Sequence, residues 1–578
     1  MQDFKPLVSI VIPVYNGDNF LREAIDSALA QTYSNIEVVV VNDGSRDDGK
    51  TREIALSYGE KIRYFEKENG GCATALNYGI GQIKGLYFSW LSHDDKYLPE
   101  KIEHQINIIR ELSDKRTIIY GGYQVIDKDS KPLYPVCPDR VLESHKLNTP
   151  LLPLLRGLIH GCSLLIPVEL FKEVGLFDAS LPSTQDYALW FDFFRVCPLH
   201  FQDRQLVQSR VHPDQGTHKI VQHIEECNEL WSGFLRRLSD SEMSVMEGSP
   251  YRFLIKTAEF LETTPYTVAA KLSRDMAAEA LGRIKVSVVI PFFNRTGWAI
   301  QAIRSVLEQS HKNFEILLID DGSSEDLSVL QEFIARDSRI KYYRQDNAGP
   351  GSARNHGVAL ASGRYIAFLD SDDTFHPEKL ETQIRYMEDG GFVLSHTSYL
   401  RMNIEGNITG EVSSGKVRGD LFPGIILTCP IAMPTVMALS SILKGNRFSE
   451  HMHIGEDVCL WITLSSKSEW GAIDVPLSSV RVGPVTAAFD RKKQVLGLIG
   501  IAYFLVRDPV FCSYGHQIRE LLSDASALIA DTKHSSQNSK NFVATLANVS
   551  LRSKLLRSLR NDGMYATWHR VRRHLGKK

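Results

Sequence analysis

Apolar runs rich in β-branched residues alternate along the chain with segments in which apolar residues recur at helical spacing. The run 7–15 is almost continuously apolar, as is typical of a strand buried on both faces of a parallel sheet. A helical pattern follows over 20–31, and short strands are predicted over 36–41 and 62–65. Because strands alternate with helices, the pattern predicts a doubly wound α/β sheet whose ligands bind at the carboxyl ends of its strands.

The whole pattern occurs twice, which indicates two copies of one domain, since the period is far too long for a solenoid. The pairs separated by 278 residues include Pro13 and Pro291, Asp43 and Asp321, and Asp94 and Asp372. Farther along, Asp186 and Asp457 are separated by 271 residues, so one loop differs in length by seven. We expect domains over 1–216 and 283–490, a helical connector over 217–282 and a helical C-terminal region over 491–578.

Polar residues cluster where the predicted strands end, and carboxylates dominate the last cluster. Asp370, Asp372 and Asp373 follow an apolar run directly, and Asp94 and Asp95 follow the matching run. Acidic groups crowded at a strand end repel one another unless a cation lies between them. A strand that merely runs into an acidic turn is the plainer interpretation of one such motif. Its recurrence within a larger matched pattern favours a site.

Five motifs in order carry a family resemblance. In the first copy they are Pro-Val-Tyr-Asn-Gly, Asn-Asp-Gly-Ser, Asn-Gly-Gly, Ser-His-Asp-Asp and Gln-Asp-Tyr-Ala-Leu-Trp, within 6–213. In the second they are Pro-Phe-Phe-Asn-Arg, Asp-Asp-Gly-Ser, Asn-Ala-Gly-Pro-Gly-Ser-Ala-Arg-Asn, Leu-Asp-Ser-Asp-Asp and Gly-Glu-Asp-Val-Cys-Leu-Trp, within 284–486. Each copy resembles a family 2 inverting glycosyltransferase. The resemblance implies the GT-A fold, a nucleoside-diphosphate sugar donor, UDP-linked by expectation, and a glycan or lipid-linked glycan acceptor.

The resemblance implies a donor site at the strand ends of each copy. Tyr15 and Phe293 can each place an aromatic face on the nucleobase, although packing in the core is the alternative. Asp43 and Asp321 would accept a hydrogen bond from the base, although each is also an ordinary Asp-Gly turn residue. The predicted donor-binding residues are Pro13, Tyr15, Asn16, Asp43, Asn69, Asn77, Ser92 and Arg210 in the first copy, and Pro291, Phe293, Asn294, Asp321, Asn347, Arg354, Asp370 and Arg481 in the second.

The same resemblance implies a divalent cation and a general base. Asp94, His212 and Asp372 would hold Mn²⁺ or Mg²⁺, which prefers oxygen ligands completed by substrate phosphates. Asp186 and Asp457 would remove the proton of the acceptor hydroxyl as it attacks the anomeric carbon. A helix N-cap is the structural alternative for these two aspartates.

Each copy departs from the family pattern somewhere, so alternatives stay open. The first copy has Leu76 and Ser92 where the second has Arg354 and Asp370, and the second has Gly483 in place of His212. Because both copies keep the aspartate of the predicted base, we still expect a bifunctional enzyme. The alternatives are an enzyme in which only one copy, by preference the second, is catalytic, and a sugar-binding scaffold without turnover.

Composition narrows the partners and the compartment. A net charge of −3 and a pI near 6.7 predict no nucleic-acid partner. The eight cysteines form no C-x-x-C pair, and the N-terminus enters a strand directly, which favours a reducing, cytoplasmic location. The apolar run 495–506 is too short to span a bilayer. The basic segment 552–578 predicts peripheral contact with the inner face of the membrane, and a solvated tail is the alternative.

Overall fold

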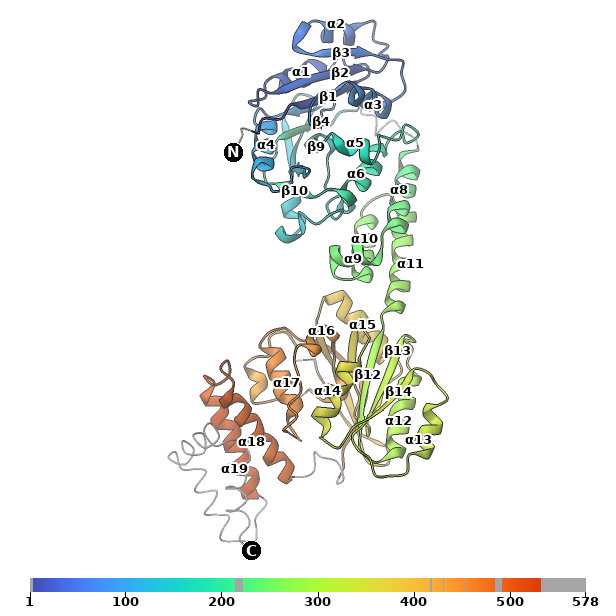
Figure 1. Cartoon of the computed structure of the whole chain (residues 1–578), viewed down its shortest axis with the longest axis vertical. Helices are drawn as coiled ribbons and strands as arrows, with labels where there is room; N and C mark the ends of the chain where they lie inside the picture. Colours follow the sequence, from blue (N-terminus) through green and yellow to red (C-terminus); the bar gives the residue numbers. More distant parts are fainter. Residues whose placement is uncertain are drawn as a thin grey trace. The chain divides into compact units, whose positions relative to one another are not determined.

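The computed structural model describes residues 4–213, 222–415, 418–429, 431–452, 454–483 and 491–531. The chain divides into two compact units, Met1–Ala278 and Glu279–Lys578 (Figure 1). Each unit contains one copy of the repeat, built on a sheet whose first four strands are parallel and which is flanked by helices. The predicted fold class of two GT-A domains, with helical segments after each, is confirmed.

The first unit begins with strands and helices in alternation and ends in helices, the last of which continues past Ala278 into the second unit. Its elements are β1 (Val8–Val14), α1 (Leu21–Leu29), β2 (Ile36–Asn42), α2 (Lys50–Leu56), β3 (Arg63–Glu66), α3 (Cys72–Gln82), β4 (Tyr87–Trp90), β5 (Lys96–Tyr97), α4 (Lys101–Glu111), β6 (Ile118–Gly121), β7 (Tyr123–Ile126), β8 (Pro132–Val136), β9 (Ile166–Pro167), α5 (Glu169–Glu173), α6 (Gln185–Val196), β10 (Leu199–Gln202), β11 (Val207–Arg210), α8 (His223–Arg237), α9 (Asp240–Glu247), α10 (Pro250–Glu262) and α11 (Thr267–Arg283).

The second unit begins with the same alternation of strands and helices and differs from the first toward its end. Its elements are β12 (Val286–Phe292), α12 (Thr296–Leu307), β13 (Phe314–Asp320), α13 (Ser328–Ile334), β14 (Ile340–Arg344), α14 (Pro350–Leu360), β15 (Tyr365–Phe368), β16 (Thr374–Phe375), α15 (Lys379–Gly390), β17 (Leu394–Met402), β18 (Ile408–Val412), β19 (Met437–Leu439), α16 (Ser440–Lys444), α17 (Glu456–Ser465), β20 (Gly471–Arg481), α18 (Arg491–Arg507) and α19 (Gly515–Asp531).

The central strands follow the order β3-β2-β1-β4-β9 in the first unit (Figure 1) and β14-β13-β12-β15-β19 in the second. All these neighbours are parallel except the last pair in each unit. Every residue of β1 and β12 is buried, as their continuous apolar runs predict. The shared order brings the ends of β1, β2 and β4, and of β12, β13 and β15, to one edge of each sheet.

A close helix–strand contact in each copy brings the glycine-rich turn to that edge. Gly79 of α3 lies so near Val11 that an added Cβ would approach the valine Cγ1 to 2.7 Å, and for Gly357 against Val289 that distance is 2.4 Å. A larger residue would push the helix off the sheet. The first turns of α3 and α14 therefore lie beside the ends of β1 and β12.

The helix that follows each copy packs on the helix that carries its predicted base. Phe234 of α8 stacks on Phe191 of α6, with ring centroids 4.3 Å apart. In the second unit α18 contacts α17, and Ile501 of α18 is buried near Gly455. The first helix after each copy is therefore part of that copy's core, and the helical pattern predicted for the connector is observed in α8–α11.

Among the described residues, no helix has both the length and the apolar character needed to span a membrane. The apolar run 495–506 forms most of α18, which packs against α19. The basic segment 552–578 lies outside the described residues.

Candidate active sites

The acidic turn after β4 presents two aspartates in different environments. Asp94 is half-buried, and its Oδ2 lies 3.1 Å from Nε2 of His212. Asp95 is buried, and its Oδ1 accepts a hydrogen bond of 2.8 Å from the backbone N–H of Arg210. Burial and the neighbouring charge of Asp94 raise the pKa of Asp95 to about 8. The side chains of Asp94 and His212 thus come together as predicted.

The turn after β15 concentrates more negative charge. The backbone N–H of Arg481 donates to Asp373 at 2.7 Å, and Nη1 of Arg295 lies 3.7 Å from Oδ2 of Asp372. Burial and the charge of Asp370 raise the pKa of Asp372, and burial and both neighbouring carboxylates raise the pKa of Asp373. Three crowded carboxylates with incompletely offset charge fit a hard divalent cation. Arg295 directly follows Asn294 in a quoted motif, but its place beside Asp372 was not predicted.

The side chains of Arg210 and Arg481 turn inward and contact the acidic turns. The Arg210 side chain is completely buried. It donates to the carbonyl oxygens of Asp94 and Lys128 and pairs with Glu23 at 3.0 Å. Arg481 donates in the same way to the carbonyl of Asp372. These hydrogen bonds hold the acidic turns in place, a structural role that the donor-binding prediction did not include.

Asp43 and Asp321 organise the glycine-rich turns. The carboxylate of Asp43 accepts backbone hydrogen bonds from Gly70 and Gly71 and pairs with Lys67 at 2.6 Å. Asp321 accepts the corresponding backbone bonds, and Nε2 of Gln345 donates to it at 2.8 Å in place of the lysine. Asp43 and Asp321 therefore act as structural residues of the turn, as the alternative interpretation predicted. The exchange of Lys67 in the first copy for Gln345 in the second was not predicted.

The predicted asparagines also hold loops. Asn16 accepts the N–H of Arg46, and Asn294 accepts the N–H of Ser324. Asn69 and Asn347 donate to the carbonyls of Asp43 and Asp321. Asn77 donates to the carbonyl of Phe177 and accepts its N–H, at 2.8 and 3.0 Å. Both ends of the Asn77 amide are thus engaged in a loop contact.

The aromatic residues at the ends of the first strands do not belong to the core. Tyr15 and Phe293 are 43% and 49% exposed, which excludes core packing and leaves their rings available to a flat ligand. Pro13 and Pro291 are buried within β1 and β12. Ser92 is half-buried, and its hydroxyl lies 3.4 Å from Sγ of Cys162.

Asp186 and Asp457 lie in the first turns of α6 and α17. The N-caps of these helices are Thr184 and Gly455, so neither aspartate is a cap. Burial raises the pKa of Asp186 to about 6, and burial together with the charge of Glu456 raises the pKa of Asp457 to about 6. A carboxylate with a pKa close to neutrality, in a polar cluster at a sheet edge, is suited to accept a proton.

An ion-pair network links the acidic turn to the base in the second copy. Arg354 places one nitrogen 2.6 Å from Glu456 and another 2.6 Å from Asp370. The side chains of Arg354 and Glu456 are only 7% and 6% exposed. In the first copy all three charges are absent together, since the matching residues are Leu76, Ser92 and Gln185.

Glu226 of α8 supports the base of the first copy, and no motif indicated this. Its carboxylate accepts the backbone N–H groups of Ser183 and Thr184 at 3.1 and 2.8 Å, and both of their hydroxyls. These two residues directly precede α6, which carries Asp186. A residue of the predicted connector therefore helps to fix the helix on which the base lies.

Comparison with known proteins identifies one family for both copies. The model described as "Glycosyl transferase family 2" matches residues 9–175 and 287–422. A Rickettsia bellii protein, "Uncharacterized glycosyltransferase", is 56% identical over 89% of this chain and 75% of its own length. A Rickettsia felis protein with the same description is 52% identical over 99% of this chain and 98% of its own.

The chain is also similar, at lower identity, to a protein named as a synthase and to a solved structure. The "Chondroitin synthase" of Escherichia coli is 26% identical over 69% of this chain and 59% of its own length. The crystal structure of S. aureus TarS residues 1–349 in complex with UDP covers 51% of this chain and 93% of its own, with 17% identity and a TM-score of 0.36.

Proposed function

Because this chain belongs to glycosyl transferase family 2 and is a glycosyltransferase, we propose that both of its copies transfer sugars from nucleoside-diphosphate donors, with UDP as the expected nucleotide. The acceptor we propose is a growing surface polysaccharide or a lipid-linked glycan. One observation carries this proposal. Each copy combines an exposed aromatic ring, an acidic turn and a carboxylate of raised pKa at the same sheet edge.

The relatives support a role in making polysaccharides. The similarity to a protein named chondroitin synthase extends over 69% of this chain, more than a single copy provides. A Bacillus subtilis protein with the description "Putative teichuronic acid biosynthesis glycosyltransferase" is 38% identical over 187 residues. Two transferase sites in one chain suit a polymer in which two sugars alternate, because each site can specialise in one donor.

In the proposed mechanism the acceptor hydroxyl attacks the anomeric carbon in a single displacement that inverts this centre. Asp186 or Asp457 takes the hydroxyl proton while the new C–O bond forms. The bond from the anomeric carbon to the diphosphate breaks, and the nucleoside diphosphate leaves with the electron pair. Asp94 with His212, and Asp372, would hold Mn²⁺ or Mg²⁺, which offsets the negative charge of the departing diphosphate. Tyr15 and Phe293 would orient the nucleobase.

The proposal predicts that each acidic turn serves its own donor. We expect Asp94→Ala and Asp372→Ala to lower nucleoside-diphosphate release by about 100-fold or more, each for a different sugar. Release from a panel of donors with acceptor, in Mn²⁺ and then in EDTA, measures this. Glu332→Ala, which changes an exposed acid, is the matched control. If Asp94→Ala leaves nucleoside-diphosphate release unchanged for every donor, the first copy is not catalytic. If the wild-type protein releases no nucleoside diphosphate from any donor, the chain is a binding scaffold without turnover.

The raised pKa of each base predicts an acid limb in the rate profile. A general base acts only when ionised, so kcat/KM for each donor should be constant above about pH 7 and should fall about tenfold per pH unit below about pH 6. The pKa of about 6 for Asp186 and Asp457 sets the pH at which the rate begins to fall. Initial rates across pH, with circular dichroism to show that the fold persists, test it. A rate that stays constant down to pH 4.5 would argue against these bases.

A further inference from the structure

A cluster of three side chains, which includes Asp95 of the first acidic turn, has no part in the mechanism above. Sγ of Cys162 lies 3.3 Å from Oδ2 of Asp95, and Nε2 of His160 lies 3.8 Å from the same oxygen. The ligand atoms that these residues offer all lie within 4.8 Å of one another. Asp95 and Cys162 are buried, whereas the side chain of His160 keeps 22% exposure. The imidazole thus connects the cluster to solvent.

The separations suit tetrahedral coordination. Zn²⁺ binds sulfur at about 2.3 Å and nitrogen or oxygen at about 2.0–2.1 Å, so tetrahedral ligand atoms lie about 3.3–3.7 Å apart. The distances of 3.3 and 3.8 Å from Oδ2 of Asp95 come close to this range. A thiol, an imidazole and a carboxylate are also the ligand types that zinc takes in proteins.

The hydrogen bonds of His160 do not account for its position. Its Nε2 lies 3.1 Å from the hydroxyl of Ser209, but within the described part of the chain its buried Nδ1 has no hydrogen-bond partner. Among the described residues, Ser209 is therefore the one hydrogen-bond partner of this ring. A cation would bind at Nε2, the nitrogen that faces Asp95, and would add a second contact that fixes the ring.

The second copy lacks the cluster although it keeps the aspartate. Gln105 donates to the carbonyl of Ser163, and the matching Gln383 donates to the carbonyl of Thr435. The two backbones therefore correspond here with a separation of 272 residues. By this register the residues that match His160 and Cys162 are Ala432 and Pro434. Neither has a side chain that binds a metal.

We propose that Asp95, His160 and Cys162 form a binding site for a thiophilic divalent cation of the Zn²⁺ class, present only in the first copy. Binding would replace the thiol proton of Cys162, which leaves to solvent, while His160 donates a lone pair and Asp95 a carboxylate oxygen. Water or the Ser209 hydroxyl would occupy the remaining position. The site differs in chemistry from the pair Asp94 and His212, because a thiolate selects softer metals than Mg²⁺.

The test uses the full chain and Co²⁺, which takes the place of Zn²⁺ and reports thiolate ligation by a near-ultraviolet charge-transfer band. We expect the wild-type protein to bind one equivalent of Co²⁺ with this band, and Zn²⁺ to abolish it. Cys162→Ala should remove the band. His160→Ala, which introduces the residue of the second copy, should weaken affinity by about 100-fold or more, since even outer-sphere partners of a metal ligand contribute about 10–100-fold.

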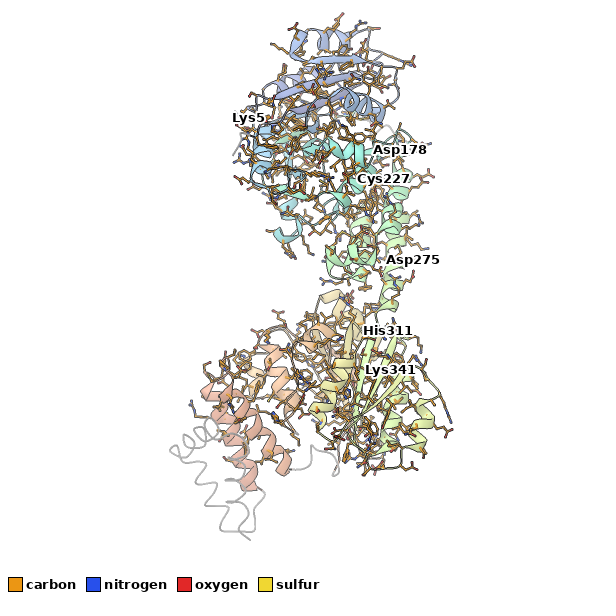
Figure 2. All side chains as sticks on the ribbon, viewed as in Figure 1. Lys5, Asp178, Cys227, Asp275, His311 and Lys341 are labelled. Carbon is orange, nitrogen blue, oxygen red and sulfur yellow. The ribbon has the colours of Figure 1, made fainter. Side chains whose placement is uncertain are left out.

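Two controls separate this site from its neighbours. Cys227 of α8 (labelled in Figure 2) lies 3.7 Å from Nε2 of His223 and is a rival thiol for Co²⁺, so Cys227→Ala should keep the band. Excess Mg²⁺ should not displace the Co²⁺. The proposal fails if the wild type shows no band, if Cys227→Ala loses it, or if Mg²⁺ removes it. Circular dichroism and donor release at the second copy verify that the variants are folded.

Discussion

Asp457→Asn is expected to abolish sugar transfer by the second copy, with a loss in kcat of about 10²–10⁴-fold. Asparagine keeps the shape of the side chain but cannot accept the proton of the acceptor hydroxyl. Because Asp457 lies in the first turn of α17 and the donor residues lie on other elements, donor affinity should change little. Initial rates at saturating donor and calorimetric titration with the nucleoside diphosphate measure the two effects separately.

Asp186→Asn is the matched variant for the first copy. If both copies are active, each asparagine variant should lose a different donor and keep the other, so each serves as the other's control. If Asp457→Asn retains transfer within about tenfold of the wild type, Asp457 is not the general base. If Asp186→Asn alone has no effect, only the second copy catalyses transfer, and the first then supports the structure or binds the acceptor.

Arg354→Leu is expected to destabilise the second unit by about 3–5 kcal/mol, the usual effect of removing one partner from a buried ion pair. The leucine is the residue of the first copy, so its size suits the site. The loss follows because Glu456, 6% exposed, would remain buried without its cation. Urea denaturation of the full chain, with the two units resolved as separate transitions, measures the change.

The triple variant Arg354→Leu, Asp370→Ser, Glu456→Gln introduces the complete set of the first copy. We expect it to recover most of the lost stability, because no buried charge remains without a partner. A triple variant that is less stable than the single variant would contradict the view that the three charges act as one unit. If the triple variant is stable but inactive, the network contributes to the chemistry of the second site beyond its role in folding.

Much of the fold was predictable because its signals are local. The continuous apolar run of β1 and its exact recurrence in β12 need no tertiary information, since a strand buried on both faces must be apolar throughout. The repeat and the order of the motifs likewise indicated which residues meet at the sheet edge. Asp186 and Asp457 were selected on that basis, and the structure places each in the first turn of a helix with a raised pKa.

The direction of a side chain at a strand end was not predictable. Arg210 and Arg481 occupy positions from which a guanidinium could face either the donor or the interior. The structure turns both inward, onto the carbonyls of the acidic turns. That choice depends on which chain segments pack around the strand end, and in the first copy these include Glu23, far away in the sequence. Motif order carries no information about such contacts.

The sequence by itself determined that there are two copies, the α/β class of each, and the acidic and basic residue types at each strand end, because these follow from local periodicity and from repetition. Only the tertiary structure decided which of those side chains are exposed and which are bonded to a loop. It also showed that Glu226 supports the base helix and that His160 and Cys162 meet Asp95. These contacts join residues that are far apart in the sequence, and Glu226, His160 and Cys162 lie outside the matched motifs. Neither the spacing of the repeat nor the order of the motifs therefore predicts them.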